Sequence, residues 1–473
     1  MSDTDARSQR PLDASPPEAW GPLFRLFRAA GRPLERFLHV EAASGVLLLL
    51  STACALIWAN SPWADSYAHF WHTAVGVRLG DFIFERPLEW VVNDGLMVIF
   101  FFVVGMEIRR EVYCGELSQW RRAALPAVAA LGGMLVPAAL YSLFAGGGGA
   151  GSGWGVPMAT DIAFAVGVLT LLGKRVPPAL RVLLLALAVI DDLGAIVVIA
   201  IFYSSGISAI GLLVGAAGLG AVVLMQRLGI RNKLAYVPPS LVAWAGVYAA
   251  GVHPTIAGVA VGLLTPVRAW LGAEGFVAGV REELGVLERA EPHVLSPHQL
   301  AGSLQHVNAA RREAVSPAEG LIHALHPWVA FGIMPIFALA NAGVSLRGAP
   351  LDATGMRVMV SVAIGLALGK PIGVTLACWI CVRSGLSRLP TGVTWRHIAV
   401  LGAVAGIGFT MALFIAQLAF SAPALLGAAK LGVLVASGLA AVVSLALGRS
   451  WLAPLSAPNA ARTADEAEAS TEH

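Results

Sequence analysis

Long apolar stretches recur along the whole chain and limit its fold more than any other feature. Five of them lie within or span runs long enough to cross a bilayer, which takes about 20 residues of helix. They are residues 46–58, 97–106, 123–144, 182–202 and 358–368. Only 13% of the 473 residues are charged, against about 25% in soluble domains. Because so few charged residues cannot shield this much apolar surface from water, we expect lipid around the chain.

Twelve segments fit membrane-spanning helices, which predicts an all-α polytopic membrane protein. We expect them at residues 41–59, 88–110, 122–145, 154–173, 178–203, 206–226, 236–250, 252–267, 321–343, 356–382, 397–420 and 425–448. An even number of spans leaves both termini on one side. Of the 32 Lys and Arg residues, 26 fall on that side, five (Lys430 among them) on the other, and Lys370 lies inside a span. By the positive-inside rule both termini are predicted to be cytoplasmic.

Three soluble segments accompany the spans, besides a C-terminal tail. The predicted organisation is a cytoplasmic N-terminal arm at 1–40, a transmembrane domain at 41–448 and a disordered cytoplasmic tail at 449–473. Within the transmembrane domain, alternating apolar residues flank a Gly-Asp pair, which predicts a short periplasmic β-hairpin in 61–87. Residues 268–320 are predicted to form a long cytoplasmic loop with acidic and basic patches.

Ionisable residues inside apolar segments are the first functional candidates, because a charge at membrane depth is costly unless it is paired or hydrated. The deepest are Asp161, Asp191, Asp192 and Lys370, whereas Asp94 and Glu107 lie nearer the ends of their helices. Neighbours on a helix point about 100° apart, so Asp191 and Asp192 need not share one site. Lys370 can neutralise one acid, which leaves the others to exchange protons for a cation. Carboxylates suit this exchange, since a hard ion such as Na⁺ prefers oxygen ligands and burial makes a carboxylate hold a proton more readily.

Two segments carry residues that disfavour a continuous helix. Asp161 follows a proline, a small residue and Thr160 in the segment 157–164, which suits a helix broken at mid-membrane. Residues 402–410 of the eleventh span are similarly irregular and rich in glycine, although close packing alone also enriches glycine. Interrupted helices in corresponding positions of two halves indicate inverted repeats with a binding site where the two broken helices cross.

Several ordered sequence blocks resemble the NhaA-type sodium/proton antiporter family. The matching blocks are residues 92–97, 104–111, 159–165, 190–196, 251–253, 326–328, 341–345, 369–371 and 406–411. The resemblance runs from about Glu41 to Leu447, nearly the whole membrane part. It implies that Asp192 is the principal carboxylate for Na⁺ and protons, with Asp161 and Thr160 assisting at the crossing. It also implies that Na⁺ binds at Asp161 and Asp192, and that Asp191 and Lys370 form a structural or proton-linked pair.

The resemblance also implies an entrance funnel at the cytoplasmic end of the second span. Glu107, Arg110 and Glu111 would lie in this funnel, which the family links to activation at alkaline pH. His323 and His326 could titrate near neutral pH, although packing or interfacial histidines are more frequent. Ile322 replaces a glutamate of the family's pH-sensing cluster, and the 268–320 loop is longer than in its best-known member. Both departures concern the pH response and not the ion site.

Family membership implies further properties of the whole protein. Members exchange Na⁺ or Li⁺ for more than one proton per ion, electrogenically, for sodium and pH homeostasis, and need no cofactor. A multi-pass protein of the bacterial inner membrane is expected, surrounded by lipid and paired into a homodimer through the 61–87 hairpin. No interaction with nucleic acid is expected.

Two other classes of function remain open at this point. A sodium-coupled symporter of the same inverted-repeat fold would need a pocket for an organic substrate, whereas the deep polar residues here are mainly acids. An intramembrane aspartyl protease would need Tyr-Asp on one helix and Gly-x-Gly-Asp on the next. The only Gly-Asp here, Gly80-Asp81, falls in the predicted hairpin, so a transporter rather than an enzyme is predicted.

Overall fold

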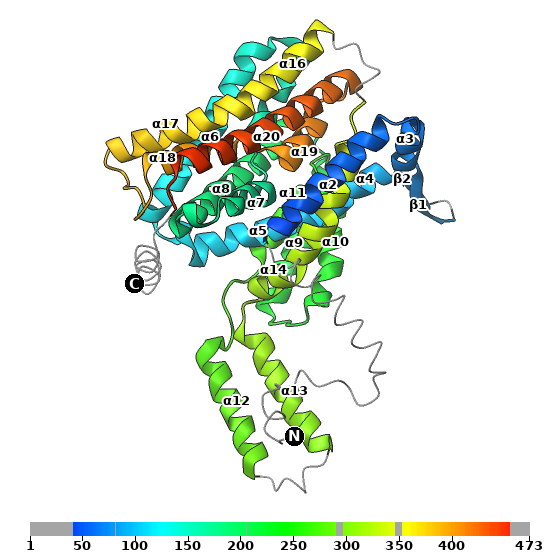
Figure 1. The fold of residues 1–473 in the computed structure, drawn as a ribbon. Helices are drawn as coiled ribbons and strands as arrows, with labels where there is room; N and C mark the ends of the chain where they lie inside the picture. Colours follow the sequence, from blue (N-terminus) through cyan, green and yellow to red (C-terminus); the bar gives the residue numbers. More distant parts are fainter. Residues whose placement is uncertain (1–40, 81, 205, 290–296, 346–351, 455–473) are drawn as a thin grey trace, which may run out of the picture.

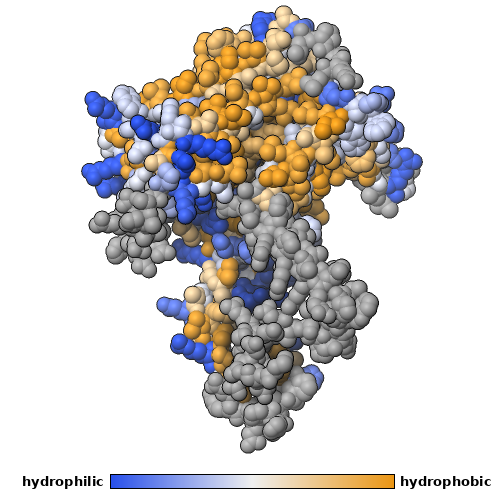
Figure 2. Space-filling view, in the orientation of Figure 1, coloured by the Kyte–Doolittle hydropathy of each residue, from blue (hydrophilic) through white to orange (hydrophobic). Residues whose placement is uncertain are grey.

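A bundle of long helices forms most of the protein. The computed structural model describes residues 41–80, 82–204, 206–289, 297–345 and 352–454 (Figure 1). The predicted N-terminal arm, most of the predicted tail and the middle of the 268–320 loop lie outside these residues. Hydrophobic residues cover the middle of the bundle, and hydrophilic residues gather at its left and right edges (Figure 2). This distribution is the one expected for helices that cross a membrane.

Seven helices in the described part of the chain are long and apolar enough to span a membrane. Four are single α-helices: α6 (Trp120–Ala145), α8 (Pro178–Phe202), α9 (Ala209–Arg227) and α20 (Pro423–Trp451). The other three each combine an α-helix, a π-helical turn and a second α-helix. They are α4 (Leu88–Trp90) with η3 (Val91–Leu96) and α5 (Met97–Cys114), α14 (Pro317–Trp328) with η8 (Val329–Ile333) and α15 (Met334–Asn341), and α16 (Ala353–Ile364) with η9 (Gly365–Gly369) and α17 (Lys370–Arg383).

Three pairs of helices are bent at a short break, and each could count as one further span. They are α2 (Glu41–Ala59) with α3 (Ala64–His72), η5 (Gly148–Met158) with α7 (Ile162–Leu171), and α18 (Trp395–Ala405) with α19 (Phe409–Ala419). Two shorter helices, α10 (Val237–Ala249) and α11 (Thr255–Leu264), complete the bundle. The described residues thus hold seven to ten candidate spans, and the number twelve stays a prediction.

Both interruptions predicted from the sequence are present. The η5–α7 pair bends by 49° and the α18–α19 pair by 46°. The two breaks lie against each other, because the Asp161 amide donates a hydrogen bond to the carbonyl of Ile407 over 2.8 Å. Gly408 permits this approach, since a Cβ there would lie 3.0 Å from the Ala159 carbonyl oxygen. Freed backbone groups of each broken helix therefore meet those of the other.

The three π-helical turns lie in spans that also carry polar residues. Turn η3 contains Asn93 and Asp94, and η9 ends one residue before Lys370. A π-helical turn inserts one extra residue into a helix and recurs at functional sites. Apolar periodicity alone does not predict these turns, and the sequence leads one to expect regular helices in all three spans.

The predicted β-hairpin is present at one end of the bundle. Strands β1 (Ala74–Leu79) and β2 (Phe82–Pro87) are antiparallel, with Leu79 paired to Phe82. Gly80 in the turn has φ of +60°, a conformation that favours glycine. Helix α3, which precedes the hairpin within 61–87, was not predicted from the sequence. Two aromatic side chains, Tyr67 and Trp71, bury one face of this helix.

The long 268–320 loop is largely helical in its described part. Helices α12 (Gly272–Arg289) and α13 (Pro297–Ala314) pack together and project from the bundle (Figure 1). Arg231 links them to the bundle through an ion pair with Glu313 and through its guanidinium, 4.0 Å from the centre of the Trp270 ring. The remaining short elements are η4 (Glu116–Ser118), η6 (Gly173–Arg175) and η7 (Lys233–Tyr236).

Candidate ion-binding site

Asp161 lies at the point where the two broken helices meet. It is the N-cap of α7, and its Oδ1 accepts a hydrogen bond from the Phe164 amide over 3.0 Å. Its Oδ2 accepts from the Thr410 amide over 3.1 Å and from the Thr410 hydroxyl. The side chain is 1% exposed. Asp161 thus joins the start of α7 to the start of α19, and the positive ends of both half-helices favour its negative charge.

Asp191, on α8, is held by a basic and a hydroxyl side chain. Its Oδ2 forms an ion pair with the Lys370 ammonium, and both side chains are fully buried. The Thr160 hydroxyl accepts a hydrogen bond from Lys370 Nζ over 2.6 Å and donates to Asp191 Oδ2 over 2.8 Å. These three residues therefore form one neutral, hydrogen-bonded group.

Asp192, the next residue on α8, has a different environment. It is 1% exposed, and neither of its carboxylate oxygens accepts a hydrogen bond from any described residue. The acidic side chains of Asp191, Glu107 and Asp161 all act on it electrostatically, and Lys370 acts with the opposite sign. An ionised carboxylate without a donor is unstable in such an interior. Asp192 must therefore take up a proton or a cation to be stable there.

The structure brings together most of the residues predicted to form the ion site. Asp161, Thr160 and Asp191 surround the crossing, and Lys370 reaches it from α17. Thr160 is attached to the Asp191–Lys370 group rather than to Asp161, the acid with which the sequence analysis grouped it. Thr410 was not among the predicted site residues, although its position two residues after Gly408 was the available signal.

The residues predicted for the entrance funnel lie along α5 and α14, which pack against each other. Arg110 Nη1 lies 3.6 Å from Glu319 Oε1, and Glu111 Oε2 accepts a hydrogen bond from the Glu116 amide over 3.1 Å. Glu107 lies one turn deeper on α5, within electrostatic range of Asp192. Glu319 was not among the residues predicted for the funnel.

His323 and His326 occupy successive turns of α14, the helix that also carries Glu319. Both histidine residues are exposed. They therefore share a helix with the Arg110 contact and do not enter the buried group around Asp191.

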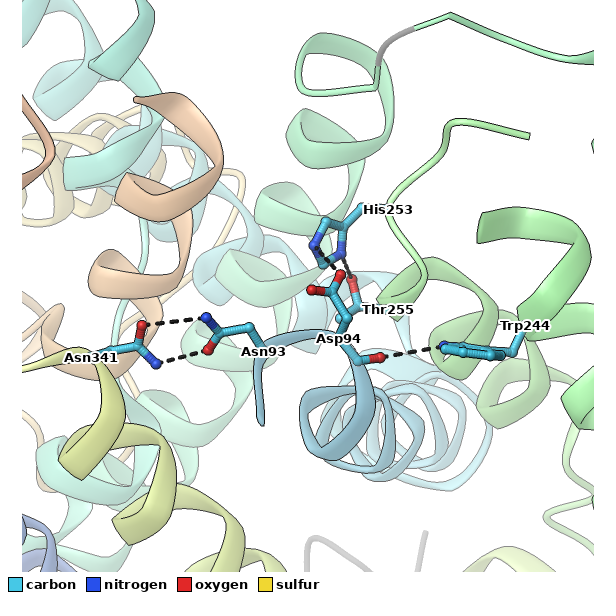
Figure 3. A network of polar contacts seen from close by, with 6 residues as sticks. All are labelled: Asn93, Asp94, Trp244, His253, Thr255 and Asn341. Atoms are coloured by element: carbon cyan, nitrogen blue, oxygen red, sulfur yellow. Dashed lines mark hydrogen bonds and ion pairs between the residues drawn. The ribbon is translucent and has the colours of Figure 1, made fainter. Parts of the chain in front are cut away.

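A second polar network lies on η3, at the hairpin end of the α4–α5 span (Figure 3). The Asn341 amide donates to Asn93 Oδ1 over 2.8 Å, which fastens α15 to η3. Asp94 Oδ1 lies 3.3 Å from His253 Nε2, and His253 Nδ1 lies 2.8 Å from the Thr255 hydroxyl. Asn93, Asp94 and His253 all fall in the family-like sequence blocks, which was the signal for this network. It links η3 to α10 through Trp244, to α11 through His253 and Thr255, and to α15.

Comparison with known proteins gives a consistent result along the whole chain. Residues 35–447 match the family described as Na⁺/H⁺ antiporter 1. The chain is 68% identical over 472 residues to "Na(+)/H(+) antiporter NhaA 2" of Myxococcus xanthus, covering 100% of both chains. It is 56% identical to the protein of that name from Sorangium cellulosum, covering 98% of this chain and 99% of the relative. It is 53% identical to "Na(+)/H(+) antiporter NhaA" of Janthinobacterium sp., covering 88% and 92%. This chain therefore belongs to the Na⁺/H⁺ antiporter 1 family.

Proposed function

We propose that this protein exchanges Na⁺ for protons across a membrane, and that Asp192 and Asp161 carry the exchange. The observation that carries this proposal is the environment of Asp192, a fully buried acid without a hydrogen-bond donor among the described residues. Such a group can be neutralised either by a bound proton or by Na⁺. Binding one excludes the other, and this competition is the basis of antiport.

Both broken helices supply oxygen atoms near the two acids. A hard cation such as Na⁺ is coordinated by carboxylate, carbonyl and hydroxyl oxygens. Asp161 already accepts three hydrogen bonds, two of them from Thr410. We propose that Asp192 is the principal ligand and that Asp161, held in position by Thr410, is the second. Thr160 assists by fixing the Asp191–Lys370 group beside them.

Lys370 gives the adjacent acids Asp191 and Asp192 different roles. Its ammonium neutralises Asp191, so a further cation at that acid would leave an excess of positive charge. The pair is thus structural, with proton exchange as a second role. Exchange of more than one proton per ion would be electrogenic, and Li⁺, another hard monovalent cation, would compete for the same oxygens.

We further propose a topology of twelve spans, in which α10 and α11 join the ten candidates. The charge asymmetry of the sequence favours cytoplasmic termini, a cytoplasmic 268–320 loop and a periplasmic hairpin. Family membership favours the bacterial inner membrane, two inverted repeats built around the broken helices, and a homodimer paired through the hairpin. The domain boundaries at 40 and 449 follow from the same assignment.

The funnel residues are proposed to serve the pH response. Arg110 and Glu319 join α5, which also carries Glu107, to α14, so a change of charge there alters the contact between these two helices. Glu111 is tied to the turn after α5. His323 and His326 are exposed on α14, the helix that carries Glu319.

The exchange is tested in everted membrane vesicles that carry the protein. A preformed pH gradient, acidic inside, should be dissipated when NaCl is added and should persist when choline chloride is added. No organic solute is present, so a sodium-coupled symporter of organic substrates would give no response. A gradient unaffected by NaCl at any pH from 6 to about 9 would contradict the proposed function.

A further inference from the structure

A polar cavity lies at the hairpin end of the bundle, apart from the crossing that holds Asp161. Its volume is about 400 Å³, and its walls come from α2, α3, α4, α15 and α20. Acidic and basic side chains both line it: Asp65 on α3, Glu89 on α4 and Lys430 on α20. A cavity of this size with polar walls has room for several water molecules.

Two hydrogen-bond donors line the cavity without a close protein acceptor among the described residues. Lys430 is 9% exposed, and Glu89 acts on its charge without forming an ion pair with it. Trp71 is 4% exposed, and its indole Nε1 has no partner within the described part of the chain. Buried donors of this kind need water or a ligand. The cavity is therefore hydrated rather than an apolar packing defect.

One helix connects this cavity to the ion site. Glu89 accepts a hydrogen bond from the side-chain amide of Gln417, near the end of α19. The same helix begins beside Thr410, whose hydroxyl donates to Asp161. Gln417 lies seven positions after Thr410, a rise of about 10 Å along the helix. The acid in the cavity and the acid at the crossing are thus held by the two ends of one short helix.

Resting on the proposed exchange, we propose that this cavity is the hydrated vestibule through which Na⁺ passes on the hairpin side, and that Lys430 opposes the binding of Na⁺ beside Glu89. Two carboxylates around water would hold a cation and slow its passage. A buried ammonium facing them repels the cation and lowers that affinity. Lys430 is therefore a positioning residue that keeps Na⁺ from resting in the vestibule.

The proposal is tested by measuring Na⁺ affinity separately from the two faces. Acid-loaded vesicles take up radioactive Na⁺ in exchange for internal protons, in right-side-out and in everted preparations. From the face that carries the hairpin, Lys430→Gln should lower the half-saturating Na⁺ concentration by about threefold or more, and Glu89→Gln should raise it. Lys430→Arg, which keeps the charge, should behave as wild type. From the opposite face all three should match wild type.

Two controls make the outcome specific. Lys174→Gln removes an exposed lysine from η6, distant in sequence from the cavity, and should change neither face. Ser421→Cys lies in the exposed turn between α19 and α20, at the same end of the bundle as the hairpin. In a chain that also carries Cys54→Ser and Cys114→Ser, it reacts with a membrane-impermeant thiol reagent only where that end is accessible. This labelling identifies the preparation that presents the hairpin face.

Several results would overturn the proposal. One is an unchanged half-saturating Na⁺ concentration from the hairpin face in folded Lys430→Gln, and another is an equal shift from both faces. If Lys430→Gln does not fold, an unchanged value in Glu89→Gln is decisive against it. Absence of exchange in the wild type would instead overturn the proposed function, so the two failures are distinguishable.

Discussion

Two faces of α8 bury acidic side chains equally deeply but give them different surroundings. The face with Asp191 meets Lys370 and Thr160, which satisfy its charge within the protein. The face with Asp192 meets no donor among the described residues and several negative charges. Depth in the membrane is therefore not what identifies an ion-binding acid. What distinguishes Asp192 is that its charge has to be balanced by a bound proton or Na⁺, both of which can dissociate.

The largest expected effect on stability comes from removing Lys370, the partner of Asp191. Lys370→Ala removes the cation and leaves Asp191 charged and buried, a change that costs about 3–5 kcal/mol. We expect a strongly lowered thermal unfolding temperature of the detergent-solubilised protein at neutral pH. The exposed Lys174→Ala is the matched control, and an unchanged unfolding temperature in Lys370→Ala would contradict the pairing.

The two neighbouring acids should respond in opposite ways to the same substitution. Asp191→Asn leaves the Lys370 ammonium buried without its counter-ion, which should destabilise the protein by several kcal/mol. Asp192→Asn removes a charge that has no partner, so its stability should be equal to or greater than that of wild type. Thermal unfolding of both variants at the same pH compares them directly. Equal losses of stability would show that the two faces do not differ.

Removal of the Thr410 hydroxyl, which donates a hydrogen bond to Asp161, should have an intermediate effect on stability and on Na⁺ affinity. Thr410→Val removes one hydrogen bond to a charged acceptor, which costs about 1.5–3 kcal/mol. We expect a raised half-saturating Na⁺ concentration, since Asp161 is no longer held in place, and a modest loss of stability. Thr170→Val is the control, because among the described residues its hydroxyl bonds a carbonyl of its own helix and no other group. The prediction fails if the two variants bind Na⁺ equally well.

Competition at Asp192 also predicts a pH dependence with a definite sign. A proton bound to the acid excludes Na⁺, so the half-saturating Na⁺ concentration should rise as the pH falls. With one competing proton, the change approaches about tenfold per pH unit on the acidic side. Exchange rates measured over a series of Na⁺ concentrations at each pH provide the values. A half-saturating concentration independent of pH would rule out direct competition.

The smallest expected effect lies at the entrance. Arg110 and Glu319 are partly exposed and 3.6 Å apart, so their ion pair contributes at most about 1 kcal/mol. Glu319→Gln should leave the unfolding temperature nearly unchanged and displace the pH profile of exchange. Glu282→Gln on α12 is the control for loss of an exposed acid. A pH profile identical to that of wild type would show that this contact plays no part in the pH response.

Strong chemical signals in the sequence predicted the broken helices and the buried acids. Proline and glycine residues and a carboxylate inside apolar segments marked the breaks. Membrane depth marked Lys370 as the partner of one buried acid, and the family resemblance identified that acid as Asp191. The partner choice of Thr160 could not be predicted, because it depends on where α17 places an ammonium. The hydroxyl of Thr410 gave no signal of its own apart from its glycine-rich context.

Lys430 shows a second limit of sequence reasoning. It was counted with the charges outside the membrane, whereas the structure buries it in the second turn of α20. The sequence does not predict whether a lysine near the end of a span is exposed or buried, since its long side chain can reach either environment. Helix α3, which packs over the cavity, was also absent from the prediction. Tertiary packing rather than local pattern created this cavity.

The exchange activity of Asp192→Asn tests the central claim most directly. The amide cannot exchange a proton for Na⁺, while the fold and the Asp191–Lys370 pair stay intact. In everted vesicles containing equal amounts of folded protein, we expect NaCl to leave the pH gradient unchanged at every pH at which the wild type dissipates it. Sodium-dependent dissipation at wild-type rates would contradict the assignment of Asp192 as the ion-binding acid.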